Sequence, residues 1–380
     1  DLRRLARGLA LLAPDRRMVL VLHYWEGWSC DRIAEFLEVP AGTVMSRLHR
    51  ARQALRDTVD TLEEEEDMTP DDEFTRAIDA EIDVLLCAHI DVVHHPDPDS
   101  YQSKLAGSRI YGPGTGDMKG IVAILLELFR RFHLESPGVP LALAITADEE
   151  RGGERGTRAL FEDFGLQCRV AIVPDGGTPD DVVVEEKGIL HLKLESTGAA
   201  CHAARPWLGH NALENLVTCA EAIQRLFPPF NADLFHWHSN CSITRIDTPN
   251  RSINRVPSHA SATLDIRFPL PHTADEILGL IGPLLCDGIT SEAIVSAEPT
   301  LLAPDPAFFD ACEEVLGDRP KERREHGGSD ARFIARQNIP VIMSRPLCGN
   351  LHSRREWIDI DSMVSFHEVC RTYLENRFDR

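Results

Sequence analysis

Apolar residues recur at helical spacing through the first 66 residues of the chain. The periodic stretches are MVLVLHYW, RIAEFLEV and TVMSRLHRARQAL. Breaks fall at Pro14, at residues 27–29 and at residues 40–42, where proline, glycine and serine separate one stretch from the next. The pattern predicts three helices. The last two, joined by a short turn, have the layout of a helix-turn-helix.

The pattern changes near residue 80, where short apolar runs begin to end in polar residues. These runs are IDVLLCAHIDVV, VPLALAITA and CRVAIVPD, and they are typical of buried strands. A glycine-rich loop and a helical stretch, GDMKGIVAILLELFRRF, separate the first two runs. Strands that alternate with helices predict a mostly parallel sheet, in which ligands bind at the carboxyl ends of the strands.

Residues 187–297 follow a different order of strand, helix, strand, strand, helix, strand. The strands are expected in ILHLKLEST, NCSITRI, ASATLDIRF and EAIVSAE, with helices at about 211–226 and 274–285. This order predicts a ferredoxin-like α+β lid inserted into an α/β domain. We therefore expect an all-α helix-turn-helix module (1–66), an acidic linker (67–79), an α/β domain in two segments (80–186 and 298–380) and the lid (187–297).

Charge is distributed unevenly along the 380 residues. The net charge is -21, yet residues 1–60 contain ten arginines against eight acidic residues, so the remainder is strongly acidic. An acidic body is a poor general binder of nucleic acid, whereas the first segment is not excluded from this role. The run TLEEEEDMTPDDEF repels itself and hydrates well, which predicts a linker.

Hydropathy and cysteine usage narrow the class of protein. No stretch of the sequence approaches the roughly 20 uninterrupted apolar residues of a membrane span. Ten cysteines lie singly, without a CxxC pair. These features predict a cytoplasmic protein that has no membrane segment and no disulfide scaffold.

Candidate chemistry gathers where the predicted strands end. The triplet Asp148, Glu149 and Glu150 follows an apolar run, and adjacent carboxylates persist in such a place when cations offset their repulsion. Imidazole and carboxylate groups suit zinc, and a carboxylate can bridge two ions. The candidate metal ligands are His89, Asp117, Glu150, Asp175 and His352. Taken singly, such residues are more often capped or solvated surface groups, so the fold has to bring them together.

The helical module resembles a known DNA-binding segment. Residues 11–55, LLAPDRRMVLVLHYWEGWSCDRIAEFLEVPAGTVMSRLHRARQAL, resemble region four of bacterial sigma factors, especially the extracytoplasmic-function type. The resemblance implies contact with DNA or RNA polymerase and DNA-facing side chains at Thr43, Ser46, Arg47 and Arg50. Met45 stands where that family usually has Lys, and the region that melts DNA is absent. The alternative is a three-helix module with a solvated basic face that serves oligomerisation or regulation.

The second body resembles the co-catalytic dizinc aminoacylases and peptidases, which include succinyl-diaminopimelate desuccinylase, acetylornithine deacetylase and glutamate-releasing carboxypeptidase. The matching stretches, in order between residues 86 and 360, are AHIDVV, GPGTGDMKG, TADEERGG, VPDGG, CHAARPWLGHNA, INRVP, LDIRF, HGGSDARFI and GNLHSRREWIDI. The resemblance implies two zinc ions per subunit, with Co²⁺ or Mn²⁺ as substitutes.

The resemblance also implies a role for each candidate residue. One zinc would have His89 and Asp175 as terminal ligands, the other would have Glu150 and His352, and Asp117 would bridge the two. The remaining implied roles are Glu149 as general base, Asp91 as the partner that orients the His89 imidazole, His202 of the lid as the oxyanion donor, often across a dimer interface, and Asn254 and Arg332 as substrate-binding residues.

We therefore expect a cytoplasmic dizinc amidohydrolase, homodimeric through its lid, that cleaves an amide bond of an N-acyl amino acid or small peptide with metal-activated water. The alternative is a sigma-like, DNA-binding transcription regulator whose hydrolase-derived body is non-catalytic. Related proteins usually have some 60 residues before the HxD strand, against about a dozen after the acidic run here. Either the helical module docks in that place, or one sheet face stays partly exposed.

Overall fold

The computed structural model describes residues 9, 12–25, 27–37, 39–64, 81–230 and 232–378. The chain divides into two compact units, residues 1–78 and 79–380. The acidic linker expected at 67–79 lies outside the described residues. Within the part of the chain that is described, no helix is both long and apolar enough to cross a membrane.

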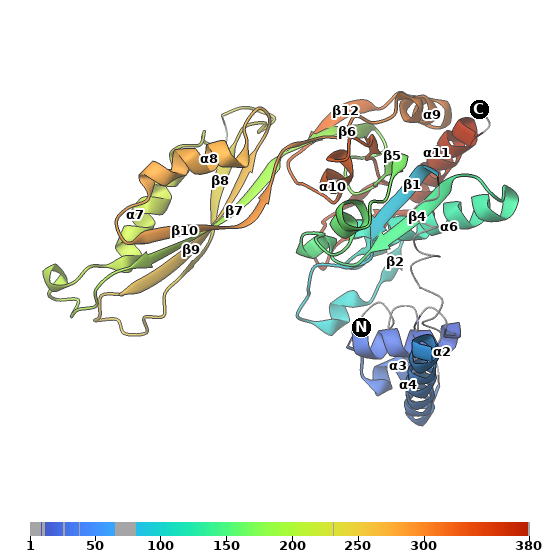
Figure 1. Cartoon of the computed structure of the whole chain (residues 1–380), viewed down its shortest axis with the longest axis horizontal. Coiled ribbons are helices and arrows are strands. Elements are labelled where there is room, and N and C mark those ends of the chain that lie inside the picture. The colour runs from blue at the N-terminus through green and yellow to red at the C-terminus, as the bar shows by residue number, and fades with distance from the viewer. Residues whose placement is uncertain are drawn as a thin grey trace. The chain divides into compact units, whose positions relative to one another are not determined.

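The first unit is a small helical module (Figure 1). Its helices are α2 (Pro14–Leu20), which continues into one π-helical turn η1 (Val21–Trp25), α3 (Cys30–Phe36) and α4 (Ala41–Glu64). The proline that starts α2 needs no N–H partner there, and the Ser29 side chain caps α3 by accepting from the backbone N–H of Arg32. A small core packs Val19, Ile33 and Val44 between the helices. The predicted helical module is confirmed.

The second unit is built on a parallel sheet in the order β13-β5-β1-β4. Its strands are β1 (Ile82–His89), β4 (Leu141–Thr146), β5 (Cys168–Ile172) and β13 (Val341–Ile342). Every residue of β1 but one is buried, because this strand lies inside the sheet. The register pairs His89 with Thr146, so the carboxyl ends of β1 and β4 lie side by side. The predicted parallel sheet is confirmed.

Helices α6 (Gly120–Glu135), α9 (Pro306–Leu316) and α11 (Ile360–Phe378) share one apolar core with the strands of this sheet. They contribute Leu125, Phe308 and Val369 to it, against Val84 of β1. At the sheet edge, residues 141–144 of β4 are only partly buried and Ile145 is 40% exposed. The edge strand therefore presents apolar surface.

Smaller elements surround the sheet. One antiparallel sheet has the order β14-β15-β3-β2, with β2 (Lys104–Ala106), β3 (Arg109–Tyr111), β14 (Cys348–Gly349) and β15 (Trp357–Asp359). Another has the order β11-β6-β12, with β6 (Asp181–Glu186), β11 (Thr300–Leu301) and β12 (Lys321–Glu325). The short helix α10 (Ala331–Ala335) completes this part.

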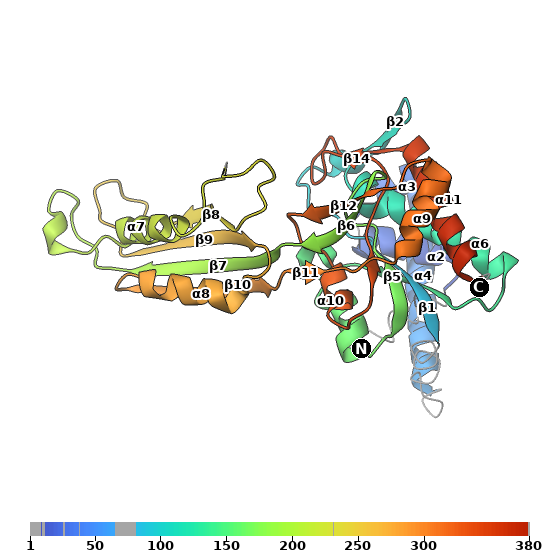
Figure 2. The same ribbon diagram turned by 90° about the horizontal axis from the view of Figure 1, so that it is seen from above.

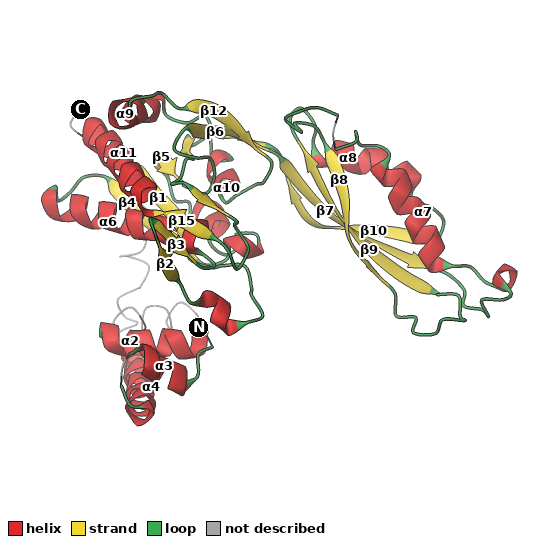
Figure 3. Cartoon of the chain, turned by 180° about the vertical axis from the view of Figure 1, so that it is seen from behind, coloured by secondary structure: helices red, strands yellow, loops and turns green. Residues whose placement is uncertain are grey.

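The lid is one antiparallel sheet with two helices. Its elements are β7 (Gly188–Thr197), α7 (Ala212–Gln224), β8 (Asn240–Asp247), β9 (His259–Phe268), α8 (Ala274–Ile281) and β10 (Ile289–Ala297), and the strand order is β10-β7-β9-β8. Buried and partly exposed residues alternate along β9, so one sheet face is apolar. Both helices lie on that face (Figures 2 and 3). The predicted ferredoxin-like order is confirmed.

Candidate metal centre

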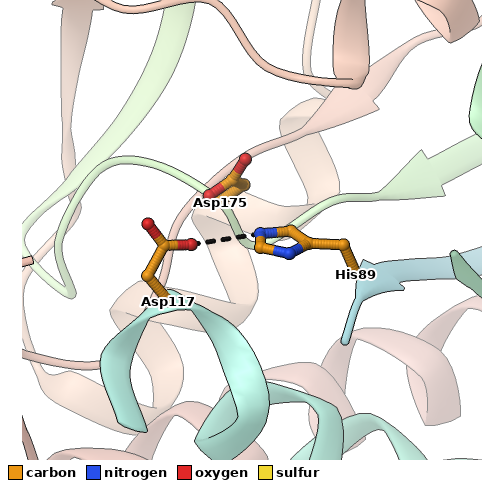
Figure 4. Close-up of side chains that lie close together, drawn as sticks. All are labelled: His89, Asp117 and Asp175. Atoms are coloured by element: carbon orange, nitrogen blue, oxygen red, sulfur yellow. Dashed lines mark hydrogen bonds and ion pairs between the residues drawn. The ribbon is translucent and has the colours of Figure 1, made fainter. Parts of the chain in front are cut away.

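The candidate ligands come from segments that are far apart in the sequence. They are His89 at the end of β1, Asp117 in the loop before α6, Glu150 in the 3₁₀ turn after β4, Asp175 after β5 and His352 in the loop before β15. The side chains of His89, Asp117 and Asp175 point toward one another (Figure 4). The parallel register explains this convergence, because neighbouring strands end at the same edge of the sheet.

The ligands form two triads that share one residue. His89, Asp117 and Asp175 make the first, and Asp117, Glu150 and His352 make the second. Within each triad, one ligand atom from every residue lies within 4.8 Å of the others. The Oδ1 atom of Asp117 lies 3.1 Å from Nε2 of His89, and its Oδ2 atom lies 2.9 Å from Nε2 of His352. The two oxygens of one carboxylate thus face different triads.

Asp91 lies behind His89, on the side away from Asp117. Its Oδ1 atom is 3.3 Å from Nδ1 of His89, while its Oδ2 atom accepts from the backbone N–H of Glu150. Burial alone lowers the pKa of His89, but hydrogen bonds with Asp117 and Asp91 outweigh burial and raise this pKa to about 12. The imidazole is therefore held between two carboxylates in a fixed orientation.

Negative charge is concentrated at this edge of the sheet. Burial, with the charge of Asp175, raises the pKa of Glu149 to about 9. Burial and the charge of Asp117 raise the pKa of Asp175 to about 7, and the same two causes raise the pKa of Glu150. Carboxylates that oppose each other's ionisation in a buried place form a favourable environment for divalent cations.

Glu356 was not singled out from the sequence, although it lies in the same matching stretch as His352. Its side chain is buried, and its Oε1 atom accepts from the backbone N–H groups of Gly116 and Asp117 at 2.8 and 2.9 Å. The loop passes so close to its neighbours that a Cβ atom on Gly116 would lie 2.8 Å from Cβ of Cys348. The only hint of Glu356 in the sequence was its position, as an acidic residue four places after the candidate ligand His352.

Arg345 is a second residue that sequence reasoning missed. Its Nη1 atom donates to the backbone oxygen of Asp175 and lies 3.9 Å from that residue's Oδ1 atom. The guanidinium is partly buried and adds positive charge beside the carboxylate of Asp175. No pattern in the sequence marks this position.

The loop that carries Glu149 is held from behind by residues 329–333. The hydroxyl of Thr157 donates to Oδ2 of Asp330 at 2.6 Å. Arg332 is buried, and its Nη2 and Nη1 atoms donate to the backbone oxygens of Gly152 and Ser329. The expected role of Arg332 in binding a substrate carboxylate stays a prediction.

The two lid candidates lie close to each other. His202 and Asn254 are both exposed and line one pocket of about 470 Å³, and the backbone N–H of Ala203 donates to the backbone oxygen of Asn254. Between described residues, no hydrogen bond or ion pair joins them to the metal-ligand candidates. Their roles toward the oxyanion and the substrate stay predictions.

The DNA-facing candidates lie within two turns of α4. Ser46 and Arg50 are exposed, whereas Thr43 and Arg47 are partly exposed. The Nε atom of Arg50 donates to the backbone oxygen of Ser46. The four side chains are available at the surface of one helix, as a groove-reading helix requires.

Both units of the chain match known protein families. Residues 85–376 match the family described as Peptidase family M20/M25/M40, and residues 2–55 match Sigma-70, region 4. A succinyl-diaminopimelate desuccinylase from Paracoccus denitrificans is 30% identical over 316 residues, which cover 76% of this chain and 82% of the relative. Another, from Rhodospirillum centenum, is 29% identical and covers 81% of this chain and 84% of the relative.

Solved structures show the same fold. A tripeptidase from Staphylococcus aureus has a TM-score of 0.64 at 17% identity and covers 79% of this chain and 82% of its own. An M20 family metallo-carboxypeptidase from Sulfolobus solfataricus has a TM-score of 0.62 at 16% identity and covers 78% and 85%. Because residues 85–376 match its model and a relative is 30% identical over most of both chains, the chain belongs to peptidase family M20/M25/M40 and is a metal-dependent amidohydrolase or peptidase.

Proposed function

We propose that this chain is a dizinc hydrolase that cleaves an amide bond of an N-acyl amino acid or small peptide. The observation that carries the proposal is the position of Asp117 in both ligand triads. Two imidazoles and three carboxylates are donors that suit zinc, and Co²⁺ or Mn²⁺ would substitute. Bound zinc would supply a Lewis acid that lowers the pKa of a water molecule and polarises the amide carbonyl.

The proposed ligand roles follow the two triads. His89 and Asp175 would hold one ion, Glu150 and His352 the other, and Asp117 both. Asp91 would fix the His89 imidazole so that Nε2 faces the ion, because its own carboxylate lies 3.3 Å from Nδ1.

Glu149 is the proposed general base. Its Oε2 atom lies 4.0 Å from Nε2 of His89, so the carboxylate stands next to the first triad. In this role Glu149 would take a proton from water and later return it to the leaving amine. Asp175 and Glu150, which lie beside Glu149, would bind metal and would therefore not serve as the base.

The lid is proposed to complete the site from a second copy of the chain. His202 would donate a hydrogen bond to the tetrahedral oxyanion, and Asn254 would contact the substrate next to it. Arg332 donates two hydrogen bonds to backbone oxygens, and its remaining N–H groups would bind a substrate carboxylate. A homodimer formed through the lid would bring these groups together.

The names of the relatives support the proposed substrate class. Those named above are desuccinylases and peptidases, so N-succinyl amino acids and short peptides are the first compounds to test. A cytoplasmic location is proposed as well, since all ten cysteines are free thiols.

The mechanism is tested with the zinc-loaded full chain and a panel of N-acetyl amino acids, N-succinyl amino acids and dipeptides. We expect Glu149→Gln to lower kcat by about 10²- to 10⁴-fold while zinc content stays unchanged. Glu154→Gln is the matched control, because Glu154 is an exposed residue of the same loop. Normal turnover by Glu149→Gln would refute the role of this residue as base.

A second function, DNA binding by the helical module, is favoured by the match of residues 2–55 to Sigma-70, region 4. Gel-shift assays of the full chain with promoter fragments test it. Arg47→Ala should weaken binding, and the affinity should fall steeply with salt. Absent or salt-insensitive binding would reject this function. Zinc-dependent turnover would reject the alternative of a DNA-binding regulator whose hydrolase-like domain is non-catalytic.

A further inference from the structure

Two loops at one end of the lid are basic, although the chain as a whole is strongly acidic. The pairing of β7 with β9 joins Gly188 to Phe268 at the end where the chain enters β7 from β6, and Thr197 to His259 at the other end. The loops 199–210 and 248–259 leave from that other end. Together they carry three arginines and three histidines and no aspartate or glutamate, in a chain with a net charge of -21.

These two loops line a shared, open pocket of about 470 Å³. It is lined by Ala200, Cys201, His202, Ser252, Asn254 and Arg255. Backbone hydrogen bonds from Ala203 to Asn254 and from Val256 to Cys201 join the loops, so their side chains keep a fixed relation. Arg255, His202 and Asn254 thus bring charged and neutral donors to one place.

No residue that the structure describes forms an ion pair with the arginine of this pocket, Arg255, which is exposed. A guanidinium in an acid-free pocket favours an anion, and its planar pair of N–H groups matches a carboxylate.

Apolar side chains around the pocket point to cover by a second copy of the chain. Ile253 lies between two lining residues and is fully exposed, and Trp207 and Leu208 are 75% and 65% exposed. Exposed apolar groups of this size mark an interaction surface. The ten residues of β7 span about 33 Å, so the pocket lies at the opposite end of the lid from the point where β6 leads into β7.

We propose that Arg255 is a specificity-determining residue that binds a carboxylate of the substrate beside His202 and Asn254. The inference rests on the proposed amide hydrolysis and deepens it by naming the group that is recognised. That carboxylate belongs either to the acyl group, as in a succinyl amide, or to the amino acid that leaves.

Matched substrate pairs test the proposal and distinguish the two sources. The first pair is the N-succinyl and N-acetyl form of one amino acid, and the second is an N-acetyl amino acid and its carboxamide. In one of the two pairs, Arg255→Gln should lower kcat/KM by about 10- to 100-fold for the substrate that carries the additional carboxylate. For the other substrate of the same pair, kcat/KM should change by less than about twofold. Arg255→Lys should restore part of the loss.

Arg251→Gln is the matched control, because Arg251 is exposed on the same acid-free loop and does not line the pocket. It should leave both ratios unchanged. Equal losses for both members of each pair, or no loss, would overturn the proposal.

A binding measurement separates this proposal from the proposed hydrolysis. The N-succinyl and N-acetyl amino acids are titrated calorimetrically into the zinc-loaded full chain carrying Glu149→Gln, with and without Arg255→Gln. Weaker binding of either ligand after Arg255→Gln supports carboxylate binding by Arg255, even if the parent hydrolyses nothing. In that case only the proposed hydrolysis fails. Unchanged binding overturns the role of Arg255 even if hydrolysis is found.

Discussion

Glu356 holds Asp117 in place: its Oε1 atom accepts from the backbone N–H of Asp117 at 2.9 Å and from that of Gly116 at 2.8 Å. The residue that joins both ligand triads is therefore anchored by a buried carboxylate from another part of the chain. This contact links the loop before α6 to the segment that carries His352.

Removal of this anchor should weaken metal binding. Glu356→Ala leaves two backbone N–H groups without their acceptor, and we expect a loss of about 10- to 100-fold in zinc affinity and about 1–3 kcal/mol in the free energy of unfolding. Competition with a zinc chelator measures the affinity. Glu356→Gln keeps an oxygen acceptor and should lose much less. Equal losses in the two variants would contradict this role.

The loop that carries Glu149 should depend on the hydrogen bond between Thr157 and Asp330. Thr157→Val removes the hydroxyl that Oδ2 of Asp330 accepts from, so we expect a loss of about 1–3 kcal/mol in the free energy of unfolding. A fall in kcat with little change in KM should accompany it. Thr157→Ser keeps the hydroxyl and should behave like the parent in urea denaturation and kinetics. Parent-like kcat in Thr157→Val would show that this bond does not position the loop.

Glu186 should make stability fall as the pH rises. Burial raises the pKa of Glu186 from its ordinary value of 4.5 to about 8, and its Oε2 atom has no partner among the described residues. The folded chain therefore keeps a proton that the unfolded chain has already released, so the free energy of unfolding decreases between these two pH values.

Glu186→Gln removes this titration. We expect the parent to lose roughly 1–3 kcal/mol more than Glu186→Gln between about pH 5 and about pH 8. Urea denaturation of both zinc-loaded proteins across this range measures the difference, and effects of other titrating groups cancel in the comparison. Parallel pH profiles would mean that Glu186 is ionised in the folded protein.

The proposed sharing of sites between subunits predicts complementation. A chain with His202→Ala and a chain with Glu149→Gln should each be inactive. Subunit exchange between them produces heterodimers in which one site combines an intact Glu149 with an intact His202, so about one quarter of the parent activity should return. If His202 serves its own subunit, the mixture stays inactive.

The strands that end at the metal centre could be predicted because β1, β4 and β5 are apolar runs that stop at polar residues. Their parallel order then brings His89, Glu150 and Asp175 to one edge. Asp117 and His352 lie away from the strand ends, in segments whose path is set by tertiary contacts and not by a periodic pattern. Their residue types made them candidates, but the strand pattern could not place them at this edge.

The supporting contacts were less predictable still. Thr157 and Asp330 are 173 positions apart, and nothing in their local sequence signals that they meet. Arg345 and Glu356 lie within a loop-rich segment whose apolar pattern is weak, so periodicity gives no information about which side chains face inward.

Anomalous diffraction at the zinc edge, from crystals of the zinc-saturated full chain, tests the central claim most directly. The account predicts two peaks, one beside His89 and Asp175 and one beside Glu150 and His352, with the Asp117 carboxylate between them. A single peak, or no peak at these residues, would contradict it.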